Sequence, residues 1–318
     1  MKSTRMFLAC AAALLLALAS VFFGPRLLNP LALDAESRQI LLLLRLPRAA
    51  VAFLMGGALG ASGLILQGVF RNPLADPYIL GLSGGASLAA ALGILLAGTL
   101  PLPLPLLAFA GALGACALVA ALGRGPEGLR PDRLLLGGIG LGFFFSAVLL
   151  LLMTLASDGG LKRTILWMSG DLSSANWELI PGGLVLILCG LALALARSKG
   201  LNVLGLGDDI AHGLGFNPGR ERFFLFVAAS LMTAAAVSLG GTVGFVGLLI
   251  PHAVRHLVGA DARRALPVSF FGGGALLCLA DSLGRSLAAP LEIPAGVIVA
   301  LIGAPWFILV LRKKGYGL

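Results

Sequence analysis

The sequence predicts an all-α polytopic membrane protein. Of its 318 residues, 58% are hydrophobic and only 12% are charged, whereas a soluble domain carries about 25% charged residues. The mean hydropathy is +1.01. The segment from Ala49 to Phe70 contains no charged residue, and a helix of this length, rising ~1.5 Å per residue, crosses a hydrocarbon core ~30 Å thick. The 45 glycines suit helices that pack closely in lipid.

Ten apolar segments within a single transmembrane domain, residues 1–318, are predicted to span the membrane. In chain order they are 6–24, 49–70, 78–98, 101–123, 134–156, 179–196, 223–239, 242–257, 265–284 and 293–311. The eighth segment is short and contains Pro251, His252 and Arg255, so its length does not guarantee a full crossing.

The first segment has two interpretations. Lys2 and Arg5 precede an apolar run, and Ala17-Leu18-Ala19 precedes Ser20, which is the pattern of a cleavable secretory signal. An uncleaved first helix is the simpler interpretation, because further spans follow at once. Cleavage would leave nine spans without changing the orientation of the remainder.

The distribution of basic residues predicts the orientation. With the N-terminus in the cytoplasm, sixteen of the 23 Lys and Arg residues fall on cytoplasmic segments, as the positive-inside rule requires. Both termini are then cytoplasmic. The seven basic residues predicted on the outside are Arg26, Arg38, Arg45, Arg48, Lys162, Arg163 and Arg285. The net charge of +9 does not indicate nucleic-acid binding, because no basic run is longer than residues 312–314.

Two connecting segments are unusually rich in apolar residues. Residues 157–178, predicted outside, contain Trp167, which is typical of an interfacial anchor. Residues 197–222 form the longest predicted cytoplasmic segment, and it is hydrophobic for a mere connector. We expect two short helices here, broken at Gly213 or Gly215, and we favour docking of a cytoplasmic partner over a purely connecting function.

Several motifs, taken together, resemble one transporter family. They include Arg45-Leu-Pro-Arg48, Arg71-Asn-Pro-Leu-Ala-Asp-Pro77, Trp167-Met-Ser-Gly170, Leu206-Gly-Asp-Asp-Ile-Ala211 and Ile250-Pro-His-Ala-Val-Arg255. From about residue 40 to 314, the chain resembles the membrane subunits of FecCD-type ABC importers, which carry iron chelates such as siderophores, haem and cobalamin. The motifs do not indicate which of these substrates applies.

The resemblance implies a type II ABC importer permease with ten transmembrane helices per subunit in a bacterial inner membrane. It implies a homodimer that works with two cytoplasmic ATPase subunits and a periplasmic substrate-binding protein. No G-x-x-x-x-G-K-[ST] motif occurs in the sequence, so we expect ATP and Mg²⁺ on the partner ATPase, and no cofactor or catalytic residue on this chain.

The resemblance also implies three sets of functional residues. Docking of the binding protein is assigned to Arg45, Arg48 and Arg285, whose guanidinium groups suit carboxylate partners. A cytoplasmic gate is assigned to Asn72, Leu74, Arg130, Pro131 and Asp132. Coupling to the ATPase is assigned to Gly207, Asp208, Asp209, Ala211, Gly213, Leu214 and Gly215. The charged segment 130–132 departs from the small hydroxyl residues that relatives can carry, so this gate is either charged or closed differently.

Other interpretations have weaker support in the sequence. An ion-coupled secondary transporter would need acidic or histidine relays in the membrane, and Asp281 is the one well-placed candidate. Asp281 also precedes Arg285 by four residues, which permits a local ion pair. A membrane enzyme would need His, Asp and Glu residues clustered in the sequence, and we find no such cluster. His252 and His256 permit either metal binding or, as we favour, interfacial hydrogen bonding. The glycines in 137–142 favour helix packing over nucleotide binding.

Overall fold

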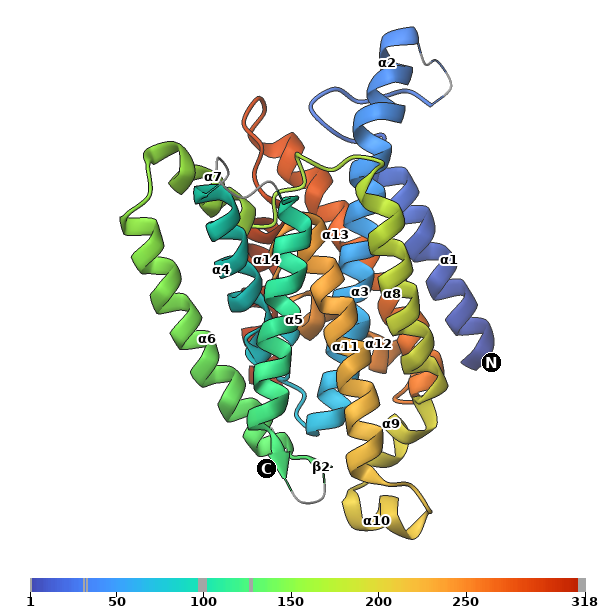
Figure 1. The fold of residues 1–318 in the computed structure, drawn as a ribbon. Coiled ribbons are helices and arrows are strands. Elements are labelled where there is room, and N and C mark those ends of the chain that lie inside the picture. Colours follow the sequence, from blue (N-terminus) through green and yellow to red (C-terminus); the bar gives the residue numbers. More distant parts are fainter. Residues whose placement is uncertain (1, 31, 33, 97–101, 126–127, 314–318) are drawn as a thin grey trace.

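The protein is a bundle of helices in a computed structural model that describes residues 2–30, 32, 34–96, 102–125 and 128–313 (Figure 1). The described strands form one short antiparallel hairpin, β1 (Arg124–Gly125) and β2 (Gly128–Leu129), with Arg124 opposite Leu129. The structure confirms the all-α class. The predicted spans 78–98 and 101–123 extend into residues 97–101, which lie outside the described residues, as does Lys314.

The helices follow one another with short connections. In order they are α1 (Lys2–Ser20), α2 (Ala35–Gln39), the π-helical η1 (Ile40–Arg45), α3 (Leu46–Phe70), the 3₁₀ turn η2 (Pro77–Leu80), α4 (Leu82–Leu95), α5 (Leu104–Leu122), α6 (Pro131–Thr154), α7 (Asp158–Met168), α8 (Leu179–Ala196), α9 (Ser198–Leu204), α10 (Asp208–Gly213), α11 (Pro218–Gly240), α12 (Val246–Val258), α13 (Ala262–Leu287) and α14 (Ala295–Lys313).

Each predicted span overlaps an apolar helix. Among the described residues, seven helices are long and apolar enough to cross a membrane, and three shorter apolar helices lie at α4, α12 and α14. The predicted span 242–257 begins earlier than the helix in the structure. Helix α12 begins only at Val246, because Gly241 and Phe245 have φ angles of 81° and 69° and interrupt the helical path.

Helices α3, α11 and α13 are the most buried of the long helices and form the middle of the bundle (Figure 1). Glycines allow α3 and α13 to approach closely. A Cβ atom on Gly56 would lie 2.1 Å from the carbonyl oxygen of Gly273, and a Cβ atom on Gly273 would lie equally close to the carbonyl oxygen of Gly56. Close packing through small residues is therefore present at this seam.

The glycines of α6 behave differently from those of α3. A Cβ atom on Gly140 or Gly142 would meet no other atom of the described chain within 4 Å, although one on Gly137 would approach Leu122. Phe143 and Phe144 beside them are exposed. The predicted packing function of these glycines is therefore not seen at Gly140 and Gly142 within one chain, because no helix of the same chain covers this face.

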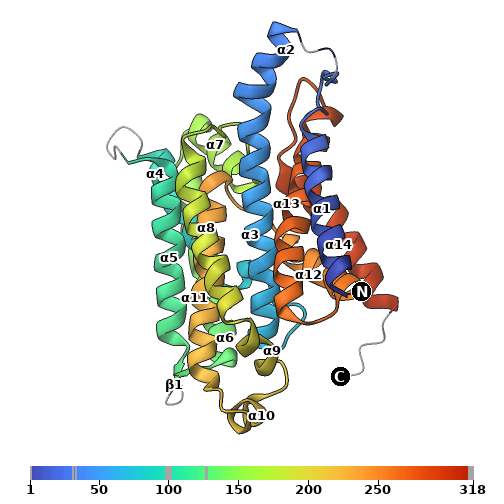
Figure 2. The same cartoon turned by 90° about the vertical axis from the view of Figure 1, so that its right-hand side faces the viewer.

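The bundle has two distinct ends. Helices α2 and α7 lie at one end, and α9, α10 and the β hairpin lie at the opposite end (Figures 1 and 2). We call these the α7 end and the α10 end. The helical path from Ala35 to Phe70 is continuous through the π-helical segment. The wider turns there leave the carbonyl oxygen of Leu42 to accept a hydrogen bond from Trp177 Nε1 at 3.0 Å.

Candidate functional site

The segment between α8 and α11 folds into the two short helices that the sequence predicts, but the break between them lies elsewhere. Helix α9 ends at Leu204, and Gly207, with φ at 118°, introduces α10. Gly215, with φ at 80°, ends α10: its N–H donates to the carbonyl of His212, and the N–H of Phe216 donates to the carbonyl of Ala211. This is a Schellman cap, which suits glycine at the left-handed position.

Helix α10 exposes an apolar surface at the tip of the α10 end. Leu206, Ile210 and Leu214 are each more than half exposed, whereas Ala211 between them is fully buried. The buried alanine holds the short helix against the protein, and the three large side chains remain available. An exposed apolar surface rimmed by charged residues is typical of a contact with another protein.

Helix α9 anchors this tip to the bundle. Asn202 donates to Asp261 at 2.9 Å and accepts from the backbone N–H of Ala262 at 2.8 Å, which joins α9 to the start of α13. Arg197 forms an ion pair with Glu221 at 3.0 Å, which joins the end of α8 to α11. The base of the tip is therefore fixed by polar contacts from two sides.

Asp208 connects α10 with two other elements. Its carboxylate forms an ion pair with Arg222 of α11 and lies 3.7 Å from the guanidinium of Arg71. Arg71 is the left-handed residue, with φ at 50°, that ends α3. Burial alone would raise the pKa of Asp208, but the hydrogen bond from Arg222 and the charges of Arg222 and Arg71 hold that pKa below its usual value.

The residues predicted as a gate lie beside α10 in two groups. Asn72 follows Arg71 directly, and its side-chain oxygen accepts from the N–H of Leu74 at 2.9 Å, which makes a tight turn. Arg130 forms a two-pronged contact with Asp132, at 3.2 and 2.9 Å. Both side chains are exposed.

One cavity joins the second gate group to the predicted coupling residues. Its volume is about 720 Å³, and its lining includes Arg130, Pro131 and Asp132 together with Asp208, Asp209, His212 and Arg222. Arg71, the residue before Asn72, contacts the carboxylate of Asp208. The structure therefore brings the second gate group and the predicted coupling residues Asp208 and Asp209 to one cavity, which no spacing in the sequence indicates.

Two of the three arginines predicted for docking meet at a buried acid at the opposite end. Arg48 donates to Asp281 at 2.9 Å, and Arg285 forms an ion pair with the same carboxylate at 3.0 Å. Arg45 instead donates to three backbone carbonyl oxygens, among them that of Arg26 at 2.6 Å. The local pair of Asp281 and Arg285 that the sequence permits is present.

The guanidinium groups of these arginines are engaged within the chain. Arg45 and Arg285 are buried, and Arg48 is nearly so. Arg48 also contacts Glu292, which is 43% exposed, at 2.7 Å. Sequence reasoning missed the contacts of Arg48, because Asp281 lies 233 residues away and Glu292 lies 244 residues away. Docking by the three arginines stays a prediction.

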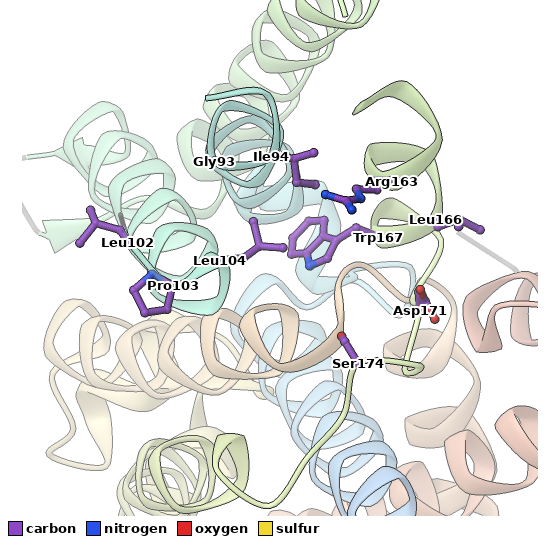
Figure 3. Close-up of a pocket in the computed structure, with 10 residues that line it drawn as sticks. All are labelled: Gly93, Ile94, Leu102, Pro103, Leu104, Arg163, Leu166, Trp167, Asp171 and Ser174. Atoms are coloured by element: carbon purple, nitrogen blue, oxygen red, sulfur yellow. The ribbon is translucent and has the colours of Figure 1, made fainter. Parts of the chain in front are cut away.

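A second cavity, of about 590 Å³, lies at the α7 end. Figure 3 shows Trp167 and Leu104 at its centre, with Arg163 near the indole ring and Asp171 nearer Ser174. The lining is mainly apolar and carries one cation and one anion, so it suits a bulky ligand with a polar edge.

The described residues contain no group of three or more His, Cys, Asp and Glu side chains placed to hold a metal ion. The rings of His252 and His256 pack edge to face with their centres 5.0 Å apart, and His252 packs similarly against Trp306 at 5.5 Å. The first contact is aromatic packing within α12, and the second joins α12 to α14.

Comparison with known proteins places this geometry in context. The FecCD transport family matches residues 7–313. A solved structure described as an inward-facing conformation of a metal-chelate type ABC transporter superimposes with a TM-score of 0.89 at 32% identity, covering 98% of this chain and 100% of that one.

Curated relatives carry related but different substrates. The hemin transport system permease protein HmuU of Yersinia pestis is 41% identical over 279 residues, which cover 85% of this chain and 83% of that protein. The cobalamin import system permease protein BtuC of Halobacterium salinarum is 40% identical over 280 residues, covering 88% and 75%. The Fe(3+) dicitrate permease protein FecC of Escherichia coli is 38% identical over 276 residues, covering 86% and 82%.

Proposed function

Because this chain belongs to the FecCD transport family, we propose that it moves an iron chelate, haem or cobalamin from the periplasm to the cytoplasm as the membrane subunit of an ATP-driven importer. The proposal places the protein in a bacterial inner membrane with both termini and the α10 end in the cytoplasm. A cytoplasmic ATPase then binds the tip that carries Leu206, Ile210 and Leu214.

One observation supports the coupling assignment most directly. Asp208 lies in the segment proposed to contact the ATPase, and the same carboxylate faces Arg71, the neighbour of the gate residue Asn72. Asp208 also lines the cavity that Arg130, Pro131 and Asp132 share. A displacement of α10 by the ATPase therefore changes the surroundings of both gate groups without a long chain of intermediate contacts.

A second copy of the chain is proposed to cover α6. The exposed face of this helix combines open glycines, Gly140 and Gly142, with the exposed aromatic residues Phe143 and Phe144. Glycines of this kind permit a close backbone approach between membrane helices. A homodimer in contact through α6 would enclose a pathway between the two copies.

The binding protein is proposed to dock at the α7 end, where the cluster around Arg48 lies. Since Arg48 already contacts the half-exposed Glu292, an incoming carboxylate would compete with Glu292 for the same guanidinium. Substitution Glu292→Gln should therefore strengthen association of the binding protein at low salt. Weakened association in this variant would show that Glu292 itself is part of the docking surface.

An ion-coupled transporter has less support than the importer. Its one candidate relay was Asp281, whose two carboxylate oxygens lie against Arg48 and Arg285. The purified chain alone in liposomes should neither hydrolyse ATP nor accumulate substrate. Proton-driven uptake by the chain alone, without ATP, would overturn the proposal.

The coupling assignment is tested by two substitutions at the α10 end in the reconstituted importer. Asp208→Asn should reduce ATP-driven uptake while the ATPase still co-purifies, because the apolar tip is unchanged. Lys199→Gln, at an exposed position of α9 outside the assigned coupling residues, serves as the control and should retain uptake. Equal uptake by both variants would contradict the coupling function of Asp208.

A further inference from the structure

A long apolar groove lies between α1, α12 and α13, away from the proposed coupling site. Its volume is about 620 Å³. Leu8, Ala12 and Leu16 line one wall, and Ile250, Leu257 and Leu276 belong to the other walls. Arg5 is the one charged residue among the described lining residues, and it lies at one extreme of the α1 wall.

The length of the groove matches one leaflet of a bilayer. Along α1 the lining runs from Arg5 to Leu16, and along α13 from Val268 to Leu279. Each of these stretches covers about 17 Å at ~1.5 Å per residue. Half of a hydrocarbon core ~30 Å thick is about 15 Å. The groove is therefore as long as the acyl region of a single leaflet.

The lining of the groove suits a flexible hydrocarbon chain. The groove has a volume of about 620 Å³, and it offers such a chain almost no polar atoms to leave unsatisfied. A helix of a second copy is the other apolar occupant, and the oligomeric state in the test below distinguishes it from a lipid.

The Arg5 end of the groove is positively charged. Leu257, close to the end of α12, lines the groove near this end, and Arg263 and Arg264 lie in the first turn of α13. The one acid there, Asp261, is committed elsewhere: its side chain accepts from Asn202 and from the backbone N–H of Arg263. Basic groups beside a groove between membrane helices favour an acidic lipid head group.

We infer that the groove binds one anionic phospholipid, with an acyl chain along Leu8, Ala12 and Leu16 and its phosphate beside Arg5. The inference goes beyond the importer function and depends only on the placement of α1, α12 and α13 in a membrane. It predicts a lipid preference that neither ATP nor the transported substrate affects.

The test titrates the purified full-length chain in mixed micelles with phosphatidylglycerol and, separately, with phosphatidylethanolamine, and counts bound lipids by native mass spectrometry. The wild type should retain one phosphatidylglycerol in preference to phosphatidylethanolamine. Arg5→Gln should weaken phosphatidylglycerol binding about fivefold, as expected for one cation at the membrane surface, and Ala12→Leu should weaken binding of both lipids by filling the groove.

Two matched variants control this experiment. Ala11→Leu adds the same side chain at the neighbouring exposed position outside the lining, and Arg38→Gln removes an exposed cation at the α7 end. Both should bind phosphatidylglycerol like the wild type. Equal retention of the two lipids by the wild type would overturn the inference. Unchanged phosphatidylglycerol binding in Arg5→Gln and Ala12→Leu would also overturn it, as would an equal loss of binding in the two control variants. A change of oligomeric state in Ala12→Leu would show that a second copy of the chain, not a lipid, occupies the groove.

Discussion

Two aspartates, at opposite ends of the molecule, each face two arginines. At the α7 end, Asp281 contacts Arg48 and Arg285, and its side chain is only 3% exposed. At the α10 end, Asp208 faces Arg71 and Arg222, and its side chain is 40% exposed. The same combination of charges thus occurs once around a buried carboxylate and once around a partly exposed one, with Arg222 the buried member of the second cluster.

Burial gives the two clusters different physical properties. Removing one partner from a buried ion pair leaves uncompensated charge and costs about 3–5 kcal/mol, whereas an exposed pair contributes about 0–1 kcal/mol. The cluster around Asp281 therefore fixes α3 against α13. Within the cluster around Asp208, the exposed contact with Arg71 can open at low cost, which suits a contact that must change during a transport cycle, whereas Arg222 is buried and holds Asp208.

The largest expected effect is on the buried cluster. Asp281→Ala should lower the free energy of unfolding by about 3–5 kcal/mol, because Arg285 then remains buried without its carboxylate. Unfolding in mixed micelles followed by circular dichroism measures this change. Glu36→Ala, at an exposed position of the same end, is the control and should cost under about 1 kcal/mol. Equal effects of the two substitutions would contradict the contrast between buried and exposed clusters.

A smaller effect is expected at the glycine seam beside the buried cluster. Gly273→Ala should destabilise the protein by about 1–3 kcal/mol, because its Cβ would lie 2.1 Å from the carbonyl oxygen of Gly56 and force α3 and α13 apart. The adjacent Gly272→Ala is the matched control, since its Cβ would lie 3.6 Å from Ile250, an ordinary contact. The same unfolding measurement should rank the two variants, and equal stability would show that the seam relaxes.

The exposed cluster should respond locally rather than globally. Arg71→Gln should lower the free energy of unfolding by less than about 1 kcal/mol, but it should speed amide hydrogen exchange in residues 207–213, because Asp208 keeps only Arg222 as a charged partner. Lys199→Gln, exposed on the neighbouring α9, should leave exchange in this segment unchanged. A global loss as large as that of Asp281→Ala would mean that the two clusters do not differ.

The smallest expected effect is that of pH on the exposed cluster. The pKa of Asp208 is lowered from its ordinary value of 3.8. A lowered folded-state pKa stabilises the folded state above the unfolded pKa, and this stabilisation is lost as pH falls through the folded value. The contribution of Asp208 to hydrogen exchange in 207–213, measured as the difference between the wild type and Asp208→Asn after correction for intrinsic rates, should therefore stay constant from pH 5 to 8. A change near pH 6 would indicate control by another group.

The helices were predictable from the sequence, because hydrophobic runs of sufficient length indicate spans without knowledge of their neighbours. The interruption before α12 was not predictable to the residue, since it depends on left-handed backbone at Phe245, a residue without a preference for it. The π-helical turns before α3 were likewise not predicted, since the Leu42 carbonyl that they free contacts Trp177, 135 residues away.

The candidate site was predictable only as separate motifs. The i, i+4 spacing of Asp281 and Arg285 indicated their pair, because helix geometry alone brings such residues together. No local rule connects Arg71 with Asp208 or Arg48 with Asp281, since each pair depends on which helices pack together. The three arginines assigned to docking illustrate the difference. The family resemblance grouped them in one function, but only the structure shows that their guanidinium groups contact Asp281 and backbone carbonyl oxygens of the same chain.

Helix α3 links the two clusters mechanically. Arg48 lies in its first turn and Arg71 ends it, so about 34 Å of regular helix separates the two cations at ~1.5 Å per residue. Over that length, a tilt of about 5° displaces one end relative to the other by about 3 Å. If Asp281 holds one end as a pivot, a modest push at the Arg71 end becomes a movement wide enough to break an ion pair.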